Sequence, residues 1–527
     1  MDIRKFLESK VLRDPDRVYL YFEDMQLTYR QFDERVNQAA NTFLQLGVRS
    51  RDRVCLMLPN SPEFLFAWLG LNKIGGIMVP INTAFKLPEA GYIVEHCEAT
   101  GIVAHPDTLG VVFPLKEKCA SLKWVAAVGG GSQDEVIPIS RLWDQSSVTL
   151  KEKLDLQGED LASIIYTSGT TGPPKGVTHT HQSYVLCGEA MTVRAGLSFE
   201  DRLMVILPLF HANAQFYSTI GSLAAEASII LTPRFSASQF WHQAKKFKAT
   251  QFNFIGAIGR ILLSRPMEEF TPDHSIRVAN GGPIPADVYK GFTERLKIPH
   301  VIDGYGLTEC PCVCQNPIDG IKKISSMGLP AKHPDPSIKF TEMKIVDDED
   351  HEIPVGKIGE LVLRSPVLMK GYFKDPSQTS EAMREGWFHT GDFCYQDEDG
   401  YFFFVDRKKD IIRRKGENIS SVEVEMVINA HPKVLESAVV PIPSSLGEDE
   451  VKAVVVLKEG QVLSPEEFIR WCSERLADFK IPRYLEYRES LPKTPSQRIA
   501  KYILRQESGR EETLNFSTMI QKEIVKK

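Results

Sequence analysis

The first half of the chain alternates between two patterns of apolar residues, one typical of helices and one typical of buried strands. Apolar side chains recur at helical spacing after Thr28, which forms a capping box with Gln31, and Gly47 is placed to end that helix. Residues 53–58 (RVCLML) and 76–81 (GIMVPI) read as buried strands, and residues 61–75 between them favour a helix. This alternation predicts a parallel sheet with helices on both faces.

The pattern changes near residue 400, where an aromatic strand runs into a dense basic stretch. Beyond it we expect a helix at residues 422–431, strands at 437–443 and 452–457, a helix from 464 to 479 and a final loop. These elements are enough for a small α+β domain of about 110 residues, which is within the usual domain range. The boundary is predicted at Asp406 to Lys409.

Composition narrows the class of protein. A chain of 527 residues is expected to form two or more domains. The formal net charge is −6 with no long basic run, which argues against nucleic acid as the main partner. The N-terminal residues lack the apolar stretch of a secretory signal, and no run approaches the roughly 20 apolar residues of a membrane span. Nine cysteines, an odd number, fit reduced thiols better than a disulfide framework, so we expect a cytoplasmic protein.

Residues 166–177 (YTSGTTGPPKGV) carry the clearest chemical signal. They follow the apolar residues 161–165, a predicted buried strand. Hydroxyl groups, glycine N–H groups and the single Lys175 suit a phosphate chain, because glycine allows close approach of the backbone. The segment is not a Walker loop, since Pro174 precedes the lysine where glycine is required and Gly176 follows where Ser or Thr is required.

This order of hydroxyls, glycines and lysine resembles the phosphate loop of the adenylate-forming enzymes, a superfamily of acyl-CoA synthetases, adenylation domains and luciferases. Further motifs follow in the family's order, from Val18 to about Lys501. They are NGGPIP (280–285), DGYGLTE (303–309), WFHTGD (387–392), DRKKD (406–410) and KGENI (415–419). Within the superfamily the chain is most similar to crotonobetaine/carnitine-CoA ligase-like synthetases, through PINTAF (80–85), PLFHANAQ (208–215) and residues 404–420.

The resemblance implies a fold and a reaction. The fold class is α/β, with helix-covered, largely parallel sheets in an N-terminal domain (1–406), a hinge (407–409) and a small mobile α+β lid (410–527). The reaction is ATP-dependent ligation of a carboxylic acid to CoA, in fatty acid or carnitine metabolism, with Mg²⁺ as cofactor. Attack of the carboxylate on the α-phosphate of ATP gives an acyl-adenylate and pyrophosphate, and the CoA thiol then displaces AMP.

The resemblance also assigns the nucleotide site, residue by residue. The implied ATP/AMP-binding residues are Thr167, Ser168, Gly169, Thr170, Thr171, Gly172, Lys175, Asn280, Gly281, Gly282, Pro283, Asp303, Gly304, Tyr305, Gly306, Thr308, Glu309, Asp392 and Arg407. Thr170 and Glu309 are the implied Mg²⁺ ligands, since both offer hard oxygen atoms. Without the other motifs, Glu309 is also consistent with a solvated surface carboxylate, and Asp392 with an ordinary turn residue.

Other assignments concern the lid and the acid. Lys409 is the implied hinge, and Lys415, Gly416 and Glu417 enter the site for the second half-reaction. The expected catalytic residues are Thr170, Lys175, His211, Glu309, Arg498 and Lys501. Candidates for the acyl pocket are His211, Phe254, Gly256, Asn280, Gly306 and Met327. Ordinary core packing is the alternative for each pocket residue, and His211 is either a gate or a hydrogen-bonded core histidine.

Cys310, Cys312 and Cys314 form a CPCVC cluster. Their one-residue spacing is not that of a zinc knuckle, which favours structural or pocket-lining thiols over a metal site.

One segment departs from the family pattern. The family's C-terminal domain ends with a glycine–lysine pair whose lysine reaches the carboxylate and the α-phosphate, but here Gln497 and Arg498 stand in those positions. Three outcomes are open. Arg498 takes the lysine's place at the carboxylate and the α-phosphate, Lys501 reaches them from one helical turn away, or adenylation is weak. Two functions are alternatives to the CoA ligase: a free-standing adenylation enzyme that loads a carrier protein, and a nucleotide-binding regulator with a weakened active site, which would explain Arg498. A homodimer is common among the resembled enzymes.

Overall fold

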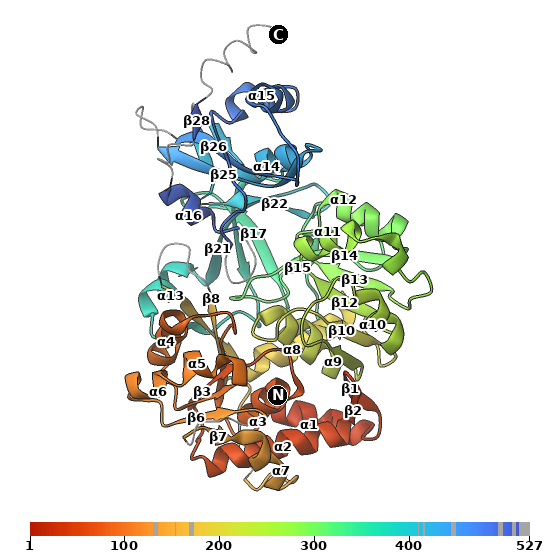
Figure 1. The fold of residues 1–527 in the computed structure, drawn as a ribbon, viewed down its shortest axis with the longest axis vertical. Coiled ribbons are helices and arrows are strands. Elements are labelled where there is room, and N and C mark those ends of the chain that lie inside the picture. The colour runs from red at the N-terminus through yellow and green to blue at the C-terminus, as the bar shows by residue number, and fades with distance from the viewer. Residues whose placement is uncertain are drawn as a thin grey trace.

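The computed structural model describes residues 1–129, 135–152, 154–167, 173–408, 410–414, 417–443, 449–493, 499–507 and 513–515. Three sheets with their helices form the N-terminal part, and a four-stranded sheet with a two-stranded ribbon forms the C-terminal part. Figure 1 shows the C-terminal part in blue at one end of the long axis, beside the strands β17, β21 and β22.

The eight-stranded sheet carries the predicted phosphate loop. All of its strands run parallel to β8 except β9, which pairs antiparallel with β8 on one side and β19 on the other. Its order is β19 (Gly371–Tyr372), β9 (Lys175–Thr180), β8 (Leu161–Thr167), β4 (Ile77–Pro80), β3 (Arg53–Met57), β5 (Gly101–Ala104), β6 (Trp124–Ala127) and β7 (Ile137–Pro138). The predicted strands at 53–58, 76–81 and 161–165 are therefore confirmed.

The nine-stranded sheet is parallel from β14 to β1 and antiparallel at both ends. Its order is β16 (Leu329–Pro330), β15 (Cys314–Gln315), β14 (His300–Tyr305), β13 (Val278–Gly281), β12 (Gln251–Phe254), β10 (Arg202–Val205), β11 (Ser228–Leu231), β1 (Val18–Phe22) and β2 (Met25–Thr28). The strands of its centre are buried at nearly every position, which is typical of a sheet covered on both faces.

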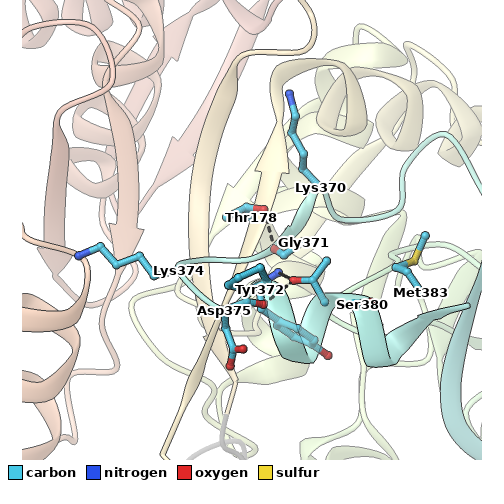
Figure 2. A pocket seen from close by; sticks show the side chains of 10 residues that line it. Thr178, Lys370, Gly371, Tyr372, Lys374, Asp375, Ser380 and Met383 are labelled. Atoms are coloured by element: carbon cyan, nitrogen blue, oxygen red, sulfur yellow. Dashed lines mark hydrogen bonds between the residues drawn. The ribbon is translucent and has the colours of Figure 1, made fainter.

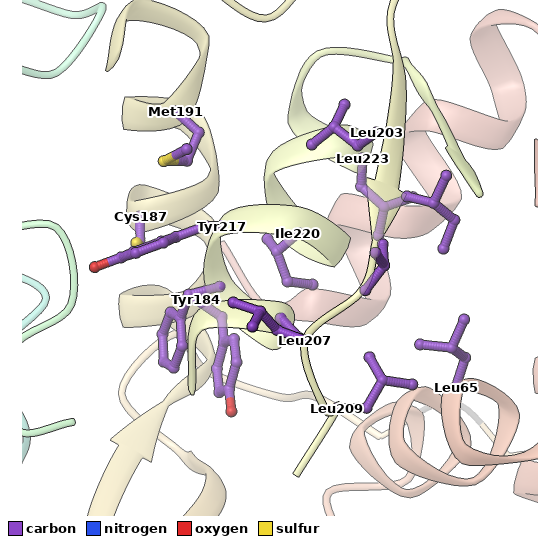
Figure 3. Close-up of a cluster of buried hydrophobic side chains, with 14 of the residues drawn as sticks. Leu65, Tyr184, Cys187, Met191, Leu203, Leu207, Leu209, Tyr217, Ile220 and Leu223 are labelled. Atoms are coloured by element: carbon purple, nitrogen blue, oxygen red, sulfur yellow. The ribbon is translucent and has the colours of Figure 1, made fainter. Parts of the chain in front are cut away.

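Helices cover these sheets. The predicted helix after Thr28 is α2 (Tyr29–Gln45) with both capping-box hydrogen bonds, and the next is α3 (Pro62–Lys73). In Figure 3, α8 (His181–Arg194) packs against η2 (Asn213–Ile220) and α9 (Gly221–Ala224) through buried apolar side chains. The ring of Tyr184 on α8 stacks 3.9 Å from that of Phe216. The remaining longer helices are α1 (Ile3–Arg13), α4 (Leu87–His96), α7 (Ile139–Gln145), α10 (Phe240–Phe247), α11 (Gly256–Ser264), α12 (Ala286–Lys290) and α13 (Pro376–Ala382).

A third, antiparallel sheet was not part of the sequence prediction. It contains β17 (Glu342–Val346), β18 (Gly359–Arg364), β21 (Trp387–Gln396), β20 (Met383–Arg384) and β22 (Phe402–Arg407). Since β22 ends at Arg407, this sheet leads the chain directly into the predicted hinge.

The C-terminal part combines a ribbon, a sheet and three helices among its described residues. The ribbon is β23 (Ile412–Arg414) and β24 (Glu417–Ile419), and the sheet is β25 (Val434–Pro443), β26 (Asp449–Leu457), β27 (Tyr484–Tyr487) and β28 (Leu514–Asn515). Its helices are α14 (Ser421–Asn429), α15 (Pro465–Ser473) and α16 (Lys501–Gln506). The helix predicted to reach residue 479 ends at Ser473, because Ala477 is extended (ψ 148°) and a short 3₁₀ turn follows. The loop predicted after it contains β27 and α16.

Two buried histidines make the fold sensitive to acid. Burial lowers the pKa of His179 and of His181 to about 4, against about 6.5 for an exposed imidazole. Between these values the unfolded chain binds protons that the folded chain excludes. The free energy of unfolding is therefore expected to fall as the pH drops from 6.5 towards 4, by about 1.4 kcal/mol per pH unit for each histidine.

Urea denaturation at pH 7.5, 6.0 and 5.0 measures this dependence. His181→Asn, which removes one titrating group, is expected to flatten it. An unchanged pH dependence in that variant would contradict the assignment.

Candidate active site

Three predicted site segments meet at one edge of the nine-stranded sheet. Phe254 ends β12 and lies opposite Gly281 of β13, which lies opposite Asp303 of β14. These strands are parallel and adjacent, so their carboxyl ends open onto the same edge, where open α/β sheets bind ligands. The backbone N–H of Ile284 donates to Asp303 (3.0 Å), and burial raises the pKa of this carboxyl to about 7.

The predicted ribose residues form a charged group beside this edge. The Tyr305 hydroxyl, at the end of β14, donates to the carboxylate of Asp392 on β21. Nε of Arg407, at the end of β22, lies 2.8 Å from the same carboxylate. Asp392 is 1% exposed, and its pairing with Arg407 compensates the charge that burial would otherwise penalise. Tyr305, Asp392 and Arg407, from distant parts of the sequence, are thus brought together.

A second group joins Lys175 to Glu309. Nζ of Lys175, the first residue of β9, lies 5.0 Å from the centre of the Tyr372 ring and donates to Oε1 of Gln378 on α13. The Tyr372 hydroxyl donates to Oε1 of Glu309 (3.0 Å). Tyr372 lines a surface pocket of about 460 Å³, and Figure 2 shows this pocket from close by. The backbone N–H of Tyr372 donates to Oγ1 of Thr379 (2.9 Å). Tyr372 is therefore the link between the predicted phosphate and metal residues.

The backbone that carries Glu309 is fixed from two sides. Nε2 of His179 donates to the carbonyl oxygen of Thr308 (2.7 Å), and the N–H of Met369 donates to the carbonyl oxygen of Glu309 (2.7 Å). Both donors come from residues close to β9 and β19, so the eight-stranded sheet determines where the Glu309 carboxylate lies.

The candidate acyl-pocket residues differ in their surroundings. Phe254 is fully buried, with its ring 4.9 Å from that of Phe292, and Met327 is 6% exposed. Nδ2 of Asn280 donates to Asn253 (2.9 Å), whose own amide donates to Ser218 (2.8 Å). His211 is half-buried before η2, with its ring 4.5 Å from that of Phe210. Gly256 begins α11, and Gly306 follows β14.

Several predicted residues lie outside the described residues. These are Ser168, Gly169, Thr170, Thr171, Gly172, Lys409, Lys415, Gly416, Gln497 and Arg498. Their neighbours are described: Thr167 and Lys175 pair across the two strands that enclose residues 168–172, and Lys493 bridges to Ile499 across residues 494–498. Gly282 and Pro283 follow β13, and the backbone of Glu417 begins β24.

Lys501 lies within the C-terminal part. Its Nζ is 2.8 Å from Oε1 of Glu425 and 2.5 Å from Oγ of Ser421. Its side chain is 13% exposed. In this conformation Lys501 joins α16 to α14.

All nine cysteines are buried free thiols, including Cys310, Cys312 and Cys314. Among the described residues there is no cluster of three or more His, Cys, Asp or Glu side chains that could hold a metal ion. No helix in the described ranges is long and apolar enough to cross a membrane.

Sequence reasoning missed Tyr372, Gln378 and His179. The GYF segment (371–373) was the available signal for Tyr372, since a glycine and an aromatic residue follow a polar turn there. Gln378 carries no signal, because its role depends on α13 packing beside β9.

Tyr372→Phe is expected to reduce the kcat/KM for MgATP about tenfold, because a hydrogen bond to a charged group contributes about 1.5–3 kcal/mol. The variant keeps the ring beside Lys175 and removes only the hydroxyl that holds Glu309. ATP–pyrophosphate exchange measured across Mg²⁺ concentrations is expected to show a higher Mg²⁺ requirement. An unchanged requirement would contradict a positioning role for the hydroxyl.

Comparison with known proteins identifies the family. Residues 7–373 match the family model described as AMP-binding enzyme, and residues 423–498 match that of the AMP-binding enzyme C-terminal domain. The crotonobetaine/carnitine–CoA ligase of Salmonella typhi is 35% identical over 510 residues, which cover 93% of this chain and 96% of the relative. Among solved structures, the anthranilate CoA ligase AuaEII in complex with anthranoyl-AMP has a TM-score of 0.88 at 29% identity, covering 96% of this chain and 97% of that one. ATP-bound MatB from Rhodopseudomonas palustris has a TM-score of 0.87 at 26% identity, covering 96% and 99%.

Fold, site and relatives together define an ATP-dependent acid–CoA ligase that works through an acyl-adenylate. The chain belongs to the AMP-binding enzyme family, with the large N-terminal domain and the separate C-terminal domain of its members. The predicted resemblance, fold class and ligase function are confirmed.

Proposed function

We propose that this ligase activates its acid at the edge formed by β12, β13 and β14, with the nucleotide between Asp392 and Lys175. The observation that carries this proposal is the convergence of two groups on the DGYGLTE segment. Tyr305 of that segment contacts Asp392 and Arg407, and Glu309 of the same segment contacts Tyr372, whose ring faces Lys175. Tyr305 at the ribose end and Glu309 at the phosphate end are only four positions apart in the sequence.

In this proposal Asp392 accepts hydrogen bonds from the ribose hydroxyls, and Arg407 is the counter-charge of that carboxylate. Lys175 leaves Gln378 to hold the β- and γ-phosphates, with Thr167, Ser168, Gly169, Thr170, Thr171 and Gly172 supplying hydroxyl and N–H donors. Attack by the acid concentrates negative charge on the α-phosphate oxygens, so fixed positive groups lower the barrier. Arg498 supplies the positive charge that a lysine supplies in the resembled enzymes.

The residues present fit a Mg²⁺ ion. Glu309 offers a carboxylate of which one oxygen is already oriented by Tyr372 (3.0 Å), and Thr170 adds a hydroxyl oxygen. Two protein ligands are enough, because Mg²⁺ usually completes its shell with substrate phosphates and water. When bound, the ion neutralises phosphate charge in the transition state.

The second half-reaction is assigned to the C-terminal domain. Rotation about Lys409 would bring Lys415, Gly416 and Glu417 to the adenylate for attack by CoA, while closure keeps water away from it. Arg407 is held by Asp392, and Asp410, three residues on, is held by Arg505 of the C-terminal part. The proposed hinge lies between these two anchors.

The identity of the acid substrate, the oligomeric state and the cellular compartment are also matters of proposal. The relatives named above act, by their names, on crotonobetaine or carnitine and on anthranilate, so family membership leaves the acid open. We place the enzyme in the cytoplasm because of its nine free thiols, and we expect a homodimer.

AMP release from MgATP across a panel of carboxylic acids, with and without CoA, tests the proposal. CoA-dependent AMP and an acyl-CoA product are expected for one acid class. AMP release that CoA does not accelerate would indicate a carrier-protein acceptor. ATP binding without AMP for any acid would indicate a regulator, and either result would contradict the proposal.

A further inference from the structure

The end of helix α4 contacts the strand that leads into the proposed phosphate loop. α4 ends at His96, and Nδ1 of its ring shares a hydrogen bond of 2.7 Å with the hydroxyl of Tyr166 on β8. Only Thr167 lies between Tyr166 and residues 168–172. Burial raises the pKa of the Tyr166 hydroxyl and lowers that of the His96 imidazole, so the hydrogen bond joins two neutral groups at pH 7.

The ring of Tyr166 also packs against β9, the strand that follows residues 168–172. Gly176 lies opposite Tyr166 in the strand pairing and directly follows Lys175. A Cβ added to Gly176 would lie 3.2 Å from Cζ of Tyr166 and 3.3 Å from Cβ of Phe373, so the tyrosine ring lies close to this backbone. Because a close-packed interior transmits displacements, a shift of the ring would also move the backbone that carries Lys175.

Phe373 connects the same helix end to a third part of the site. Its ring lies 5.9 Å from that of His96, and its N–H donates to the carbonyl oxygen of Gly176 (2.7 Å). Nζ of Lys374 donates to the carbonyl oxygen of His96 (3.1 Å). Tyr372, which joins the predicted phosphate and metal residues, directly precedes this pair in the chain. His96 therefore lies where β8, β9 and the chain after Tyr372 meet.

We propose that His96 is a positioning residue for ATP, which fixes the strands on both sides of residues 168–172 relative to each other through Tyr166 and Phe373. This inference rests on the proposed function, because it takes residues 168–172 as the phosphate site. His96 acts through its neighbours, and the precise placement of groups that bind the phosphates is what it supplies. Its effect belongs to the first half-reaction, since the β- and γ-phosphates leave as pyrophosphate before CoA attacks.

Kinetics of His96→Leu, in both half-reactions, test the inference. The KM for MgATP is expected to rise about threefold to tenfold, the effect of losing one neutral hydrogen bond, while the KM for the acid stays unchanged. Thioester formation from synthetic acyl-adenylate and CoA is expected at the parent rate, because it does not involve the β- and γ-phosphates. Tyr166→Phe removes the other half of the hydrogen bond and is expected to give the same change, and the double variant no more than either single variant.

Two further variants separate the hydrogen bond from general packing. His96→Asn places an amide near the position of Nδ1 and is expected to recover part of the lost affinity for MgATP. Tyr92→Phe is the matched control, since it removes a hydroxyl from the same helix but keeps the ring that stacks on His96 (5.4 Å). Its KM for MgATP is expected to equal that of the wild type.

Other results overturn the inference in distinct ways. An unchanged KM for MgATP in folded His96→Leu contradicts it, and so does an equal loss of both half-reactions with a lower melting temperature, which would mean that His96 only stabilises the fold. If His96→Leu does not fold, Tyr166→Phe decides by the same criteria.

Failure of the proposed function gives a different result. A wild type that releases no AMP with any acid rejects that function, and MgATP binding measured by calorimetry then decides the role of His96. Weaker binding by His96→Leu than by the wild type would support the positioning role, and equal binding would reject it. A wild type that does not bind MgATP would reject both.

Discussion

Arg498→Ala is expected to slow acyl-adenylate formation by about a hundredfold to a thousandfold, the usual effect of removing one charged donor from a transition state. The reason is the charge that develops on the α-phosphate when the acid attacks. Arg498 is proposed to meet that charge. The chain on both sides of residues 494–498 is held, since Lys493 bridges to Ile499 and the N–H of Ala500 donates to the carbonyl oxygen of Pro492 (2.8 Å).

The measurement separates the two half-reactions. ATP–pyrophosphate exchange reports adenylation, and synthetic acyl-adenylate supplied with CoA reports thioester formation. The first is expected to fall and the second to stay near the parent rate. Arg498→Lys is the matched control, since it restores the family's residue and is expected to recover adenylation. Exchange at the parent rate in Arg498→Ala would remove Arg498 from the mechanism.

Lys501→Ala is expected to destabilise the C-terminal domain by about 3–5 kcal/mol, the effect of breaking a buried ion pair from one side. Glu425 would keep its carboxylate in a site where burial already raises its pKa and where Lys501 is the counter-charge. The N–H of Val439 donates to the same carboxylate oxygen (2.7 Å), so Glu425 also links α14 to β25. The pair therefore supports α14, α16 and the sheet together.

A double-mutant cycle tests this structural role. Lys501→Met with Glu425→Gln removes both charges and is expected to recover most of the stability lost in the single variants. Urea denaturation, with unfolding of the C-terminal part monitored by proteolysis, gives the free energy of unfolding of each variant. A Lys501→Ala variant of parent stability that no longer adenylates would contradict the account, and would instead give Lys501 the role proposed for Arg498.

Helices and strands that are marked by patterns within a short stretch of sequence could be predicted. The Thr28–Gln31 capping box and the apolar spacing after it define α2, and short apolar runs define β3, β4 and β8. The motifs at the ends of β13 and β14 were identified through the family resemblance. Their glycines and polar residues lie at the carboxyl edge of parallel strands, where open α/β sheets bind ligands.

Other features depend on contacts between distant segments. Tyr372 and Glu309 are 63 residues apart, and Lys175 and Gln378 are 203 apart, so no periodicity could join them. The antiparallel sheet of β17, β18 and β21 was missed: β17 and β21 are only partly buried, whereas β18 is buried along most of its length.

The fate of the acid's oxygen atoms tests the central claim most directly. The accepted acid is labelled with ¹⁸O in its carboxyl group and converted with MgATP and CoA, and the products are analysed by mass spectrometry. Formation of an acyl-adenylate predicts that one labelled oxygen appears in AMP and none in pyrophosphate. Label in inorganic phosphate, with ADP as the nucleotide product, would show an acyl phosphate and contradict the account.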